Sequence, residues 1–176
     1  MKGPVQLIVV LFLVCGLAAG SLAFVNAATK DRIAEFARTE KIEAMQKVMT
    51  EAEEFAELVP NKVWESRRGG QAIGHVLAAS TQGYSGPIQS LLGIDAGNAV
   101  TGVRVLIQTE TPGLGAKIIG DKFLAQFRGK PAEQLILRKD DPAGAIDAIT
   151  AATISSRALT AALKKTIEAY QKGELK

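Results

Sequence analysis

A run of small and hydroxyl-bearing residues over positions 147–156 is the part of this chain best suited to chemistry. It reads Asp-Ala-Ile-Thr-Ala-Ala-Thr-Ile-Ser-Ser, and Leu159, Leu163 and Ile167 follow at four-residue spacing, which predicts a helix. Backbone N–H groups at a helix N-terminus lack intrahelical acceptors, and the helix dipole favours negative charge there. The run is therefore suited to bind a phosphate group.

The same residues also have an ordinary structural use. Thr150, Thr153 or Ser155 can serve as the helix N-cap, a position that Ser and Thr often fill. Composition alone favours this use, because short motifs of this kind often occur by chance. A resemblance carried by this run and by two other blocks shifts the balance towards a ligand site.

The run resembles the Asp-x-x-Ser/Thr-Gly-Ala-Thr-x-Ser-Ser signature of the FMN-binding domain in the G subunit of the Rnf electron-transport complex. The related C subunit of the sodium-pumping NADH:quinone oxidoreductase shares this signature. Two blocks upstream are similar to segments of the same family: Gly-Tyr-Ser-Gly-Pro-Ile at 83–88 and Glu-Thr-Pro-Gly-Leu-Gly at 110–115. In that family the last Thr of the signature carries FMN through a phosphoester bond, and the matching residue here is Thr153.

One position departs from the family signature. Ala151 stands where the family has Gly. Because Ala does not adopt positive φ cheaply, we expect ordinary helical or extended angles at Ala151.

The resemblance implies that other residues of the three blocks contact the flavin or its phosphate. They are Tyr84, Glu110, Thr111, Gly113, Leu114, Asp147, Thr150, Ala152 and Ser155. Three side chains keep a second role open. Tyr84 suits a ring edge but is equally ordinary on a surface. Glu110 can bond the ribityl hydroxyls or form a salt bridge, and Asp147 can contact the cofactor or cap local N–H groups.

Composition excludes several classes of function. The chain has 176 residues, a net charge of +3 and no dense basic stripe, so we expect no nucleic-acid partner. With one cysteine, Cys15, and one histidine, His75, it cannot form an internal disulfide, an all-cysteine metal site or a multi-histidine metal site. We expect His75 to be structural. The sequence has no nucleophile–histidine pair and no dinucleotide-binding loop, so we expect no catalytic residues, and redox chemistry requires an organic cofactor.

Residues 5–25 form an uncharged apolar run long enough to span a bilayer as a helix. Lys2 precedes it, so the positive-inside rule predicts a cytoplasmic N-terminus and an extracytoplasmic domain. A cleaved signal peptide is an alternative, because Val25-Asn26-Ala27 resembles a cleavage site. A lipid anchor on Cys15 is disfavoured, because Val14 is not a small residue.

The pattern of the remaining chain predicts an α+β fold, with an antiparallel sheet flanked by helices. The expected domains are a membrane anchor at 1–29, an amphipathic connecting helix at 30–60, which Pro60 ends, and an FMN-binding domain at 61–176. Within the last domain we expect a loop at 61–70, strands at 72–80, 87–94 and 99–109, a hairpin turn at 95–98, a helix at 121–127 and a strand at 134–138.

The resemblance implies an electron-carrier subunit of an Rnf-type membrane complex. Such complexes move electrons between ferredoxin and NAD and couple this to sodium or proton transport. The implied partners are the other subunits, the lipid bilayer and a magnesium-dependent flavin transferase that installs FMN from FAD. Two alternatives are a membrane-anchored module of the same fold without redox chemistry, and a self-contained flavoenzyme. The lack of clustered acid–base residues disfavours the flavoenzyme.

Overall fold

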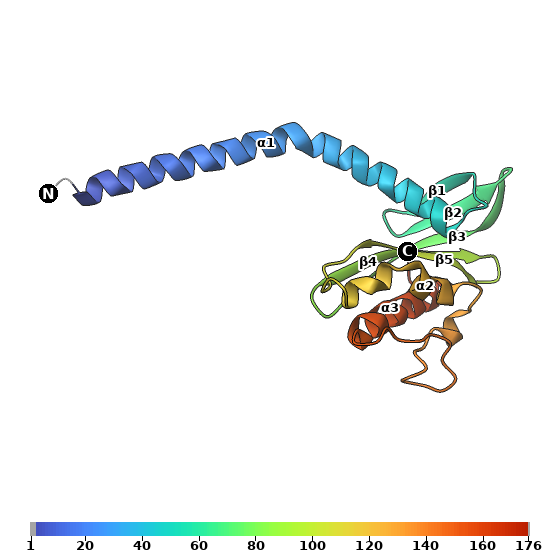
Figure 1. The fold of residues 1–176 in the computed structure, drawn as a ribbon. Coiled ribbons are helices and arrows are strands. Elements are labelled where there is room, and N and C mark those ends of the chain that lie inside the picture. The colour runs from blue at the N-terminus through green and yellow to red at the C-terminus, as the bar shows by residue number, and fades with distance from the viewer. Residues whose placement is uncertain (1–2, 176) are drawn as a thin grey trace. The chain divides into compact units, whose positions relative to one another are not determined.

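The computed structural model describes residues 3–175 and contains two long helices, a five-stranded sheet and short helical turns (Figure 1). The chain divides into two compact units, the first ending at Glu40 and the second beginning at Lys41. The elements are α1 (Gly3–Val48), β1 (Glu54–Val59), β2 (Val63–Arg68), β3 (Gln71–Gln82), β4 (Pro87–Asp95), β5 (Val100–Ile107), η1 (Gly115–Ile119), α2 (Asp121–Leu124), η2 (Ala125–Phe127), η3 (Ala132–Gln134) and α3 (Thr153–Gln171). The predicted α+β class is confirmed.

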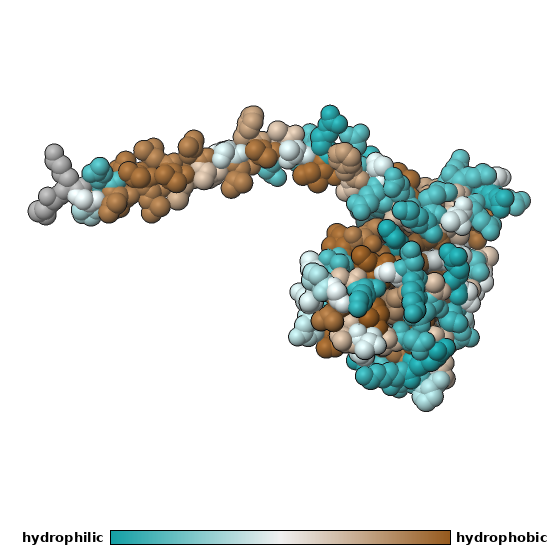
Figure 2. All heavy atoms as spheres, in the orientation of Figure 1, coloured by the Kyte–Doolittle hydropathy of each residue, from teal (hydrophilic) through white to brown (hydrophobic). Residues whose placement is uncertain are grey.

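The first unit consists of the N-terminal part of α1. Among the described residues α1 is the one helix long and apolar enough to cross a membrane, and its apolar part is not buried within the protein. Figure 2 shows hydrophobic side chains along this part of the helix. The predicted spanning segment at 5–25 lies within it, whereas Lys2, on which the predicted orientation depends, lies outside the described residues.

The predicted helix over 30–60 is wrong beyond Val48, because α1 ends there and residues 54–59 form β1. The predicted loop over 61–70 is also wrong, since residues 63–68 form β2. The two strands pair with each other, for example Phe55 with Ser66, and this pairing satisfies the backbone hydrogen-bonding groups along the edge that they share. The apolar spacing that continues past Val48 belongs to residues packed on the sheet, which local periodicity does not distinguish from a helix.

The five strands form an antiparallel meander in the order β1-β2-β3-β4-β5. The three predicted strands are confirmed as β3, β4 and β5. The predicted turn at 95–98 joins β4 to β5, where the Asp95 carboxylate accepts the N–H groups of Gly97 at 2.8 Å and Ala99 at 3.0 Å. Gly69 and Gly70, with φ of 56° and 79°, form the turn between β2 and β3, as expected for a two-residue hairpin.

Both faces of the sheet are covered. On one face, α3 and the short helical turns bury a large apolar cluster that includes Leu77, Leu92, Phe127 and Leu163. On the other face, the end of α1 packs Met45, Val48 and Met49 against Trp64, Val76 and Leu91. His75 lies in β3, where its ring centroid is 5.0 Å from that of Tyr170 in α3, and burial lowers the pKa of His75.

Two short segments follow the sheet. The predicted helix at 121–127 is confirmed as α2 followed by η2. The predicted strand at 134–138 is wrong: η3 ends at Gln134, and Leu137 forms only an isolated parallel bridge with Ile146. Within residues 3–175 no strand lies beside this segment, and its backbone bonds to the loop at 145–146 instead.

The buried hydroxyls of Ser90 and Ser156 provide a matched test of packing. The Ser90 Oγ is buried without a hydrogen-bond partner among the described residues, whereas the Ser156 Oγ donates to the Ala152 carbonyl at 2.9 Å and accepts the Ile149 N–H at 3.1 Å. Ser90→Ala should leave the free energy of unfolding unchanged or raise it by about 1 kcal/mol, whereas Ser156→Ala should lower it by about 1–3 kcal/mol. Denaturant unfolding of both variants checks this, and equal losses would contradict it.

Candidate functional site

The site is built around the start of α3. Thr153 is its first residue, and the residue before it, Ala152, has no side-chain oxygen to cap the helix. The N–H groups of Thr153, Ile154 and Ser155 have no backbone acceptor within residues 3–175, whereas the N–H of Ser156 begins the helical pattern by donating to the Ala152 carbonyl at 3.0 Å. The N-cap alternative is therefore wrong for Thr150, Thr153 and Ser155, and the N-terminal donors of α3 remain open.

The turn that leads into α3 corrects the expectation for Ala151. Its φ is 63°, in the left-handed region, rather than helical or extended. The Ala152 N–H donates to the Ile149 carbonyl at 3.0 Å, and Ser156 Oγ accepts the Ile149 N–H at 3.1 Å. The first bond closes a turn over 149–152 and the second ties that turn to α3, and the positive φ of Ala151 at the third position of the turn is that of a type II turn.

Glu110 joins the three sequence blocks of the site. It is buried, with 5% of its surface exposed. Its Oε2 accepts the Ser155 hydroxyl at 2.6 Å, and its Oε1 accepts the Ser85 N–H at 3.1 Å. A buried carboxylate needs such donors, because burial without them costs several kcal/mol. Glu110 therefore cross-links the loops at 83–86 and 110–115 to the first turn of α3, and it forms no salt bridge among the described residues.

Two glycines leave room for this carboxylate. A Cβ atom at Gly83 would collide with Glu110 Oε1, and one at Gly115 would collide with Glu110 Oε2 and the Ser155 Oγ. Glycines let the backbone come close to a neighbouring group. In the structure they first allow close approach of Glu110, a role that only the long-range contact reveals.

A cavity of about 450 Å³ lies beside the start of α3. It brings together seven of the predicted contact residues from the three blocks. Its lining is Tyr84, Glu110, Thr111, Leu114, Gly115, Ala151, Ala152, Thr153, Ile154 and Ser155. The side chains of Tyr84, Leu114 and Ile154 are exposed around it. Gly113 does not line the cavity, but with a φ of 77° it forms the turn between Thr111 and Leu114.

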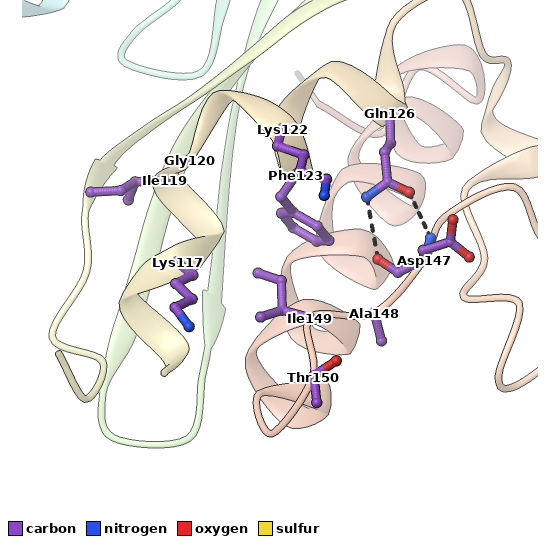
Figure 3. Close-up of a pocket in the computed structure, with 10 residues that line it drawn as sticks. All are labelled: Lys117, Ile119, Gly120, Lys122, Phe123, Gln126, Asp147, Ala148, Ile149 and Thr150. Atoms are coloured by element: carbon purple, nitrogen blue, oxygen red, sulfur yellow. Dashed lines mark hydrogen bonds between the residues drawn. The ribbon is translucent and has the colours of Figure 1, made fainter. Parts of the chain in front are cut away.

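Asp147 and Thr150 line a different cavity of about 730 Å³. Figure 3 shows it between η1 and the segment at 147–150, with the Phe123 ring beside Ile149. Gln126 fixes this segment, because its amide accepts the Asp147 N–H at 2.7 Å and donates to the Asp147 carbonyl at 3.3 Å. Residues of the signature run up to Thr150 line this larger cavity, and those from Ala151 onwards line the cavity beside α3. The sequence did not predict that the run would be divided between two cavities.

Two ion pairs hold the loop that precedes the signature. Arg138 Nη1 lies 2.9 Å from Asp147 Oδ2. Arg157, in the second turn of α3, donates to both oxygens of Asp140 at 2.6 Å, and its guanidinium lowers the pKa of that carboxyl. Asp147, at the start of the signature run, and Arg157, just after its end, are thus both tied to the loop at 138–140.

The arrangement offers three open N–H donors, a threonine hydroxyl and an apolar rim. Unlike the hydroxyls of Ser155, Ser156 and Thr160, the Thr153 hydroxyl has no hydrogen-bond partner among the described residues. The described residues contain no cluster of His, Cys, Asp and Glu that could hold a metal ion. The site can therefore bind a phosphate and can offer Thr153 as its ester partner.

The Glu110 cross-link can be tested by stability. Glu110→Ala should lower the free energy of unfolding by about 2 kcal/mol or more, because it leaves the buried Ser155 hydroxyl and the Ser85 N–H without their acceptor. Glu133→Ala removes an exposed carboxylate and serves as the control, with a change within about 0.5 kcal/mol. Equal unfolding midpoints for both variants would contradict the cross-link.

The backbone at Ala151 can be tested with a pair of glycine substitutions. Ala151→Gly should raise the free energy of unfolding by up to about 1 kcal/mol, because glycine adopts the observed positive φ without the cost of a Cβ. Ala161→Gly, at an exposed position inside α3, should lower it by about 0.5–1 kcal/mol, because glycine is less favourable than alanine within a helix. Thermal unfolding of both variants checks the prediction, and destabilisation by Ala151→Gly would show that the turn has other angles.

Comparison with known proteins identifies the family. The model of the FMN-binding domain matches residues 83–168. The G subunit of the Na(+)-translocating ferredoxin:NAD(+) oxidoreductase complex of Acetobacterium woodii is 34% identical, over 92% of this chain and 89% of that protein. The G subunit of the ion-translocating oxidoreductase complex of Methanosarcina acetivorans is 30% identical, over 95% of this chain and 94% of that protein.

Solved structures give a consistent result. The C subunit of the Na(+)-translocating NADH-quinone reductase from Parabacteroides distasonis is 27% identical with a TM-score of 0.54, over 62% of this chain and 60% of that one. NqrC from Shewanella oneidensis shares the fold, with a TM-score of 0.51 at 18% identity, over 72% of this chain and 74% of that one. This chain belongs to the family of G subunits of ion-translocating ferredoxin:NAD oxidoreductase complexes, and it contains an FMN-binding domain.

Proposed function

We propose that this chain is a membrane-anchored electron carrier in an ion-translocating ferredoxin:NAD oxidoreductase complex, with FMN attached to Thr153 by a phosphoester bond. The observation that carries the proposal is the position of Thr153. Its hydroxyl lies at the start of α3, on the wall of a cavity, without a hydrogen-bond partner among the described residues. Family membership supplies the rest of the proposal.

The residues around Thr153 fit a phosphate. The open N–H groups of residues 153–155 can donate to phosphate oxygens, and the dipole of the 19-residue α3 favours the negative charge. Thr150 is the other threonine of the signature, but it lines the neighbouring cavity, away from these donors. This difference makes Thr153 the better ester partner.

Attachment of the cofactor is a balanced transfer. The Thr153 Oγ bonds to the phosphorus of the FMN half of FAD, the pyrophosphate bond breaks, AMP leaves and the hydroxyl proton is lost. A separate flavin transferase is needed for this step, because no side chain suited to act as a general base lines the cavity besides Glu110. Glu110 already accepts two hydrogen bonds.

The remaining wall of the cavity suits a flat, largely apolar ring. Tyr84, Leu114 and Ile154 are exposed apolar or amphipathic side chains at its rim. When bound, FMN supplies electron transfer, which the side chains of this chain do not supply by themselves. The role of the protein residues is to hold the phosphate, orient the ring and leave one ring edge accessible to a redox partner.

The apolar segment of α1 anchors this carrier in the cell membrane, with the N-terminus in the cytoplasm and the domain outside it. Its length and lack of burial within the protein support a single spanning helix. The other subunits of the complex are the expected redox neighbours, as the names of the relatives indicate. A domain of this fold without redox chemistry is the competing proposal.

Replacement of Thr153 by Val tests the attachment. Thr153→Val removes the ester oxygen with little change in shape, so the purified chain should lack the added mass of one FMN minus water and should show no flavin fluorescence after denaturation. Thr150→Val is the matched control and should retain both. Intact mass and peptide mapping of the two variants, produced with an active flavin transferase, give the readout.

Thr153→Val and Thr150→Val also distinguish an electron carrier from a membrane-anchored module without redox chemistry. Electron transfer by the assembled complex should stop with Thr153→Val and continue with Thr150→Val, while both variants insert into the membrane to the same extent. Flavin that remains on Thr153→Val, or complex activity that is unchanged by it, would overturn the proposal.

A further inference from the structure

A third cavity, lined only by residues that precede the signature run, contains positive side chains from three segments. It has a volume of about 350 Å³ and lies at the free edge of β5, the last strand of the sheet. Lys47 comes from the end of α1, Arg104 from β5 and Arg128 from the residue after η2, and Asp121 of α2 lines it as well. We propose that this cavity binds a phosphate ester.

Among the described residues, none of these three cations forms a salt bridge with a carboxylate. The salt bridges among the described residues are Arg67–Glu65, Arg68–Glu51, Arg138–Asp147 and Arg157–Asp140, and none involves Lys47, Arg104 or Arg128. Asp121 lines the same cavity without forming an ion pair with any of them. The cavity between these groups therefore suits an anionic ligand, with which the three cations can form charge-assisted hydrogen bonds.

Hydrogen bonds to the backbone fix Arg128 and its segment before any ligand arrives. Arg128 donates its Nε–H to the Thr101 carbonyl at 3.0 Å, which orients the guanidinium and leaves its two terminal nitrogens free to bind. The segment behind it is pinned to β5, because the Gly129 N–H donates to the Val100 carbonyl at 2.7 Å and the Val100 N–H donates to the Lys130 carbonyl at 3.0 Å. Such preorganisation lowers the entropic cost of binding.

The end of α1 is fixed in a similar way. The Thr101 hydroxyl donates to the Val48 carbonyl at 2.6 Å, which anchors the residue next to Lys47. Gly102 permits this contact, because a Cβ atom there would lie 2.9 Å from the Val48 Cα. The residues that flank Lys47 and Arg104 are thus part of the packing between the end of α1 and β5.

The lining also indicates what the phosphate carries. The Asp121 carboxylate would repel a bare phosphate, but it can accept a hydrogen bond from a hydroxyl or an ammonium group attached to the phosphate. Val103, Leu124 and Ala125 provide a small apolar wall. The fitting ligand is a phosphate ester with a hydroxyl- or amine-bearing substituent, which is the chemistry of both a soluble sugar or glycerol phosphate and a phospholipid headgroup.

Calorimetric titration of the purified, full-length, flavin-loaded chain in detergent tests this site. The probes are inorganic phosphate and glycerol 3-phosphate, and glycerol 3-phosphate should bind more tightly. The paired variant Arg104→Gln/Arg128→Gln should weaken binding by about tenfold or more for each arginine replaced. Lys165→Gln/Lys172→Gln removes the same charge from exposed positions of the C-terminal segment and should change the affinity by less than about twofold.

Asp121→Asn adds a test of the substituent. The variant should bind inorganic phosphate more tightly, and the difference in affinity between glycerol 3-phosphate and inorganic phosphate should become smaller. Lys47→Gln changes an exposed side chain and should weaken both probes, so it tests the site even if the double arginine variant does not fold. Native mass spectrometry of the same chains with phosphatidylglycerol or phosphatidylcholine distinguishes a phospholipid headgroup from a soluble phosphate ester. If the chain retains phosphatidylglycerol only when the arginines are present, and does not bind glycerol 3-phosphate, the ligand is a phospholipid headgroup.

Binding of glycerol 3-phosphate that needs the arginines assigns a soluble ester. The proposal is overturned if the arginine variant binds both probes and phosphatidylglycerol like the unmodified chain, or if the lysine control loses as much affinity as the arginine variant.

Discussion

The buried carboxylate of Glu110 is the interaction on which the site depends. It accepts hydrogen bonds from the loop at 83–86 and from the first turn of α3, and it belongs to the loop at 110–115, so one side chain joins three segments that are distant in the sequence. Because Ser155, its partner at 2.6 Å, is two residues from Thr153, the same bond sets the position of the α3 N-terminus against the two loops. Without this cross-link the wall of the cavity beside Thr153 would have no fixed geometry.

The sheet provides the rigid surface on which this site is mounted. The loop at 83–86 follows β3 and the loop at 110–115 follows β5. On one face of the sheet, α3 packs through Leu159, Leu163 and Ile167. The opposite face receives the end of α1, and Gly93 and Gly102, on β4 and β5, allow its close approach. The apolar segment and the residues that pack on the sheet both belong to α1, Gly3–Val48.

Backbone strain occurs at Ala151, two residues before Thr153. Ala151 is one of three non-glycine residues with positive φ among those the structure describes, and the other two, Asn61 and Asn98, are of the type that tolerates this conformation in turns. At Ala151 the hydrogen bonds of the turn at 149–152 outweigh the steric cost of its Cβ, which is of the order of 1 kcal/mol. Local rules are most often broken where a site requires it, and the turn that presents Thr153 fits that pattern.

Short stretches of the sequence are sufficient to define the elements whose signals are local. They predicted α3, the strands β3 to β5, the turn at 95–98 and the apolar segment of α1, because period, length and turn residues are properties of a few neighbouring positions. The signature blocks also singled out Thr153 and Glu110. Tertiary contacts were needed to decide that Phe55 lies in a strand, that Ala151 adopts positive φ, that Glu110 bonds Ser155, and that Asp147 and Thr150 line a separate cavity. These features depend on pairing and packing between distant segments, which no local pattern encodes.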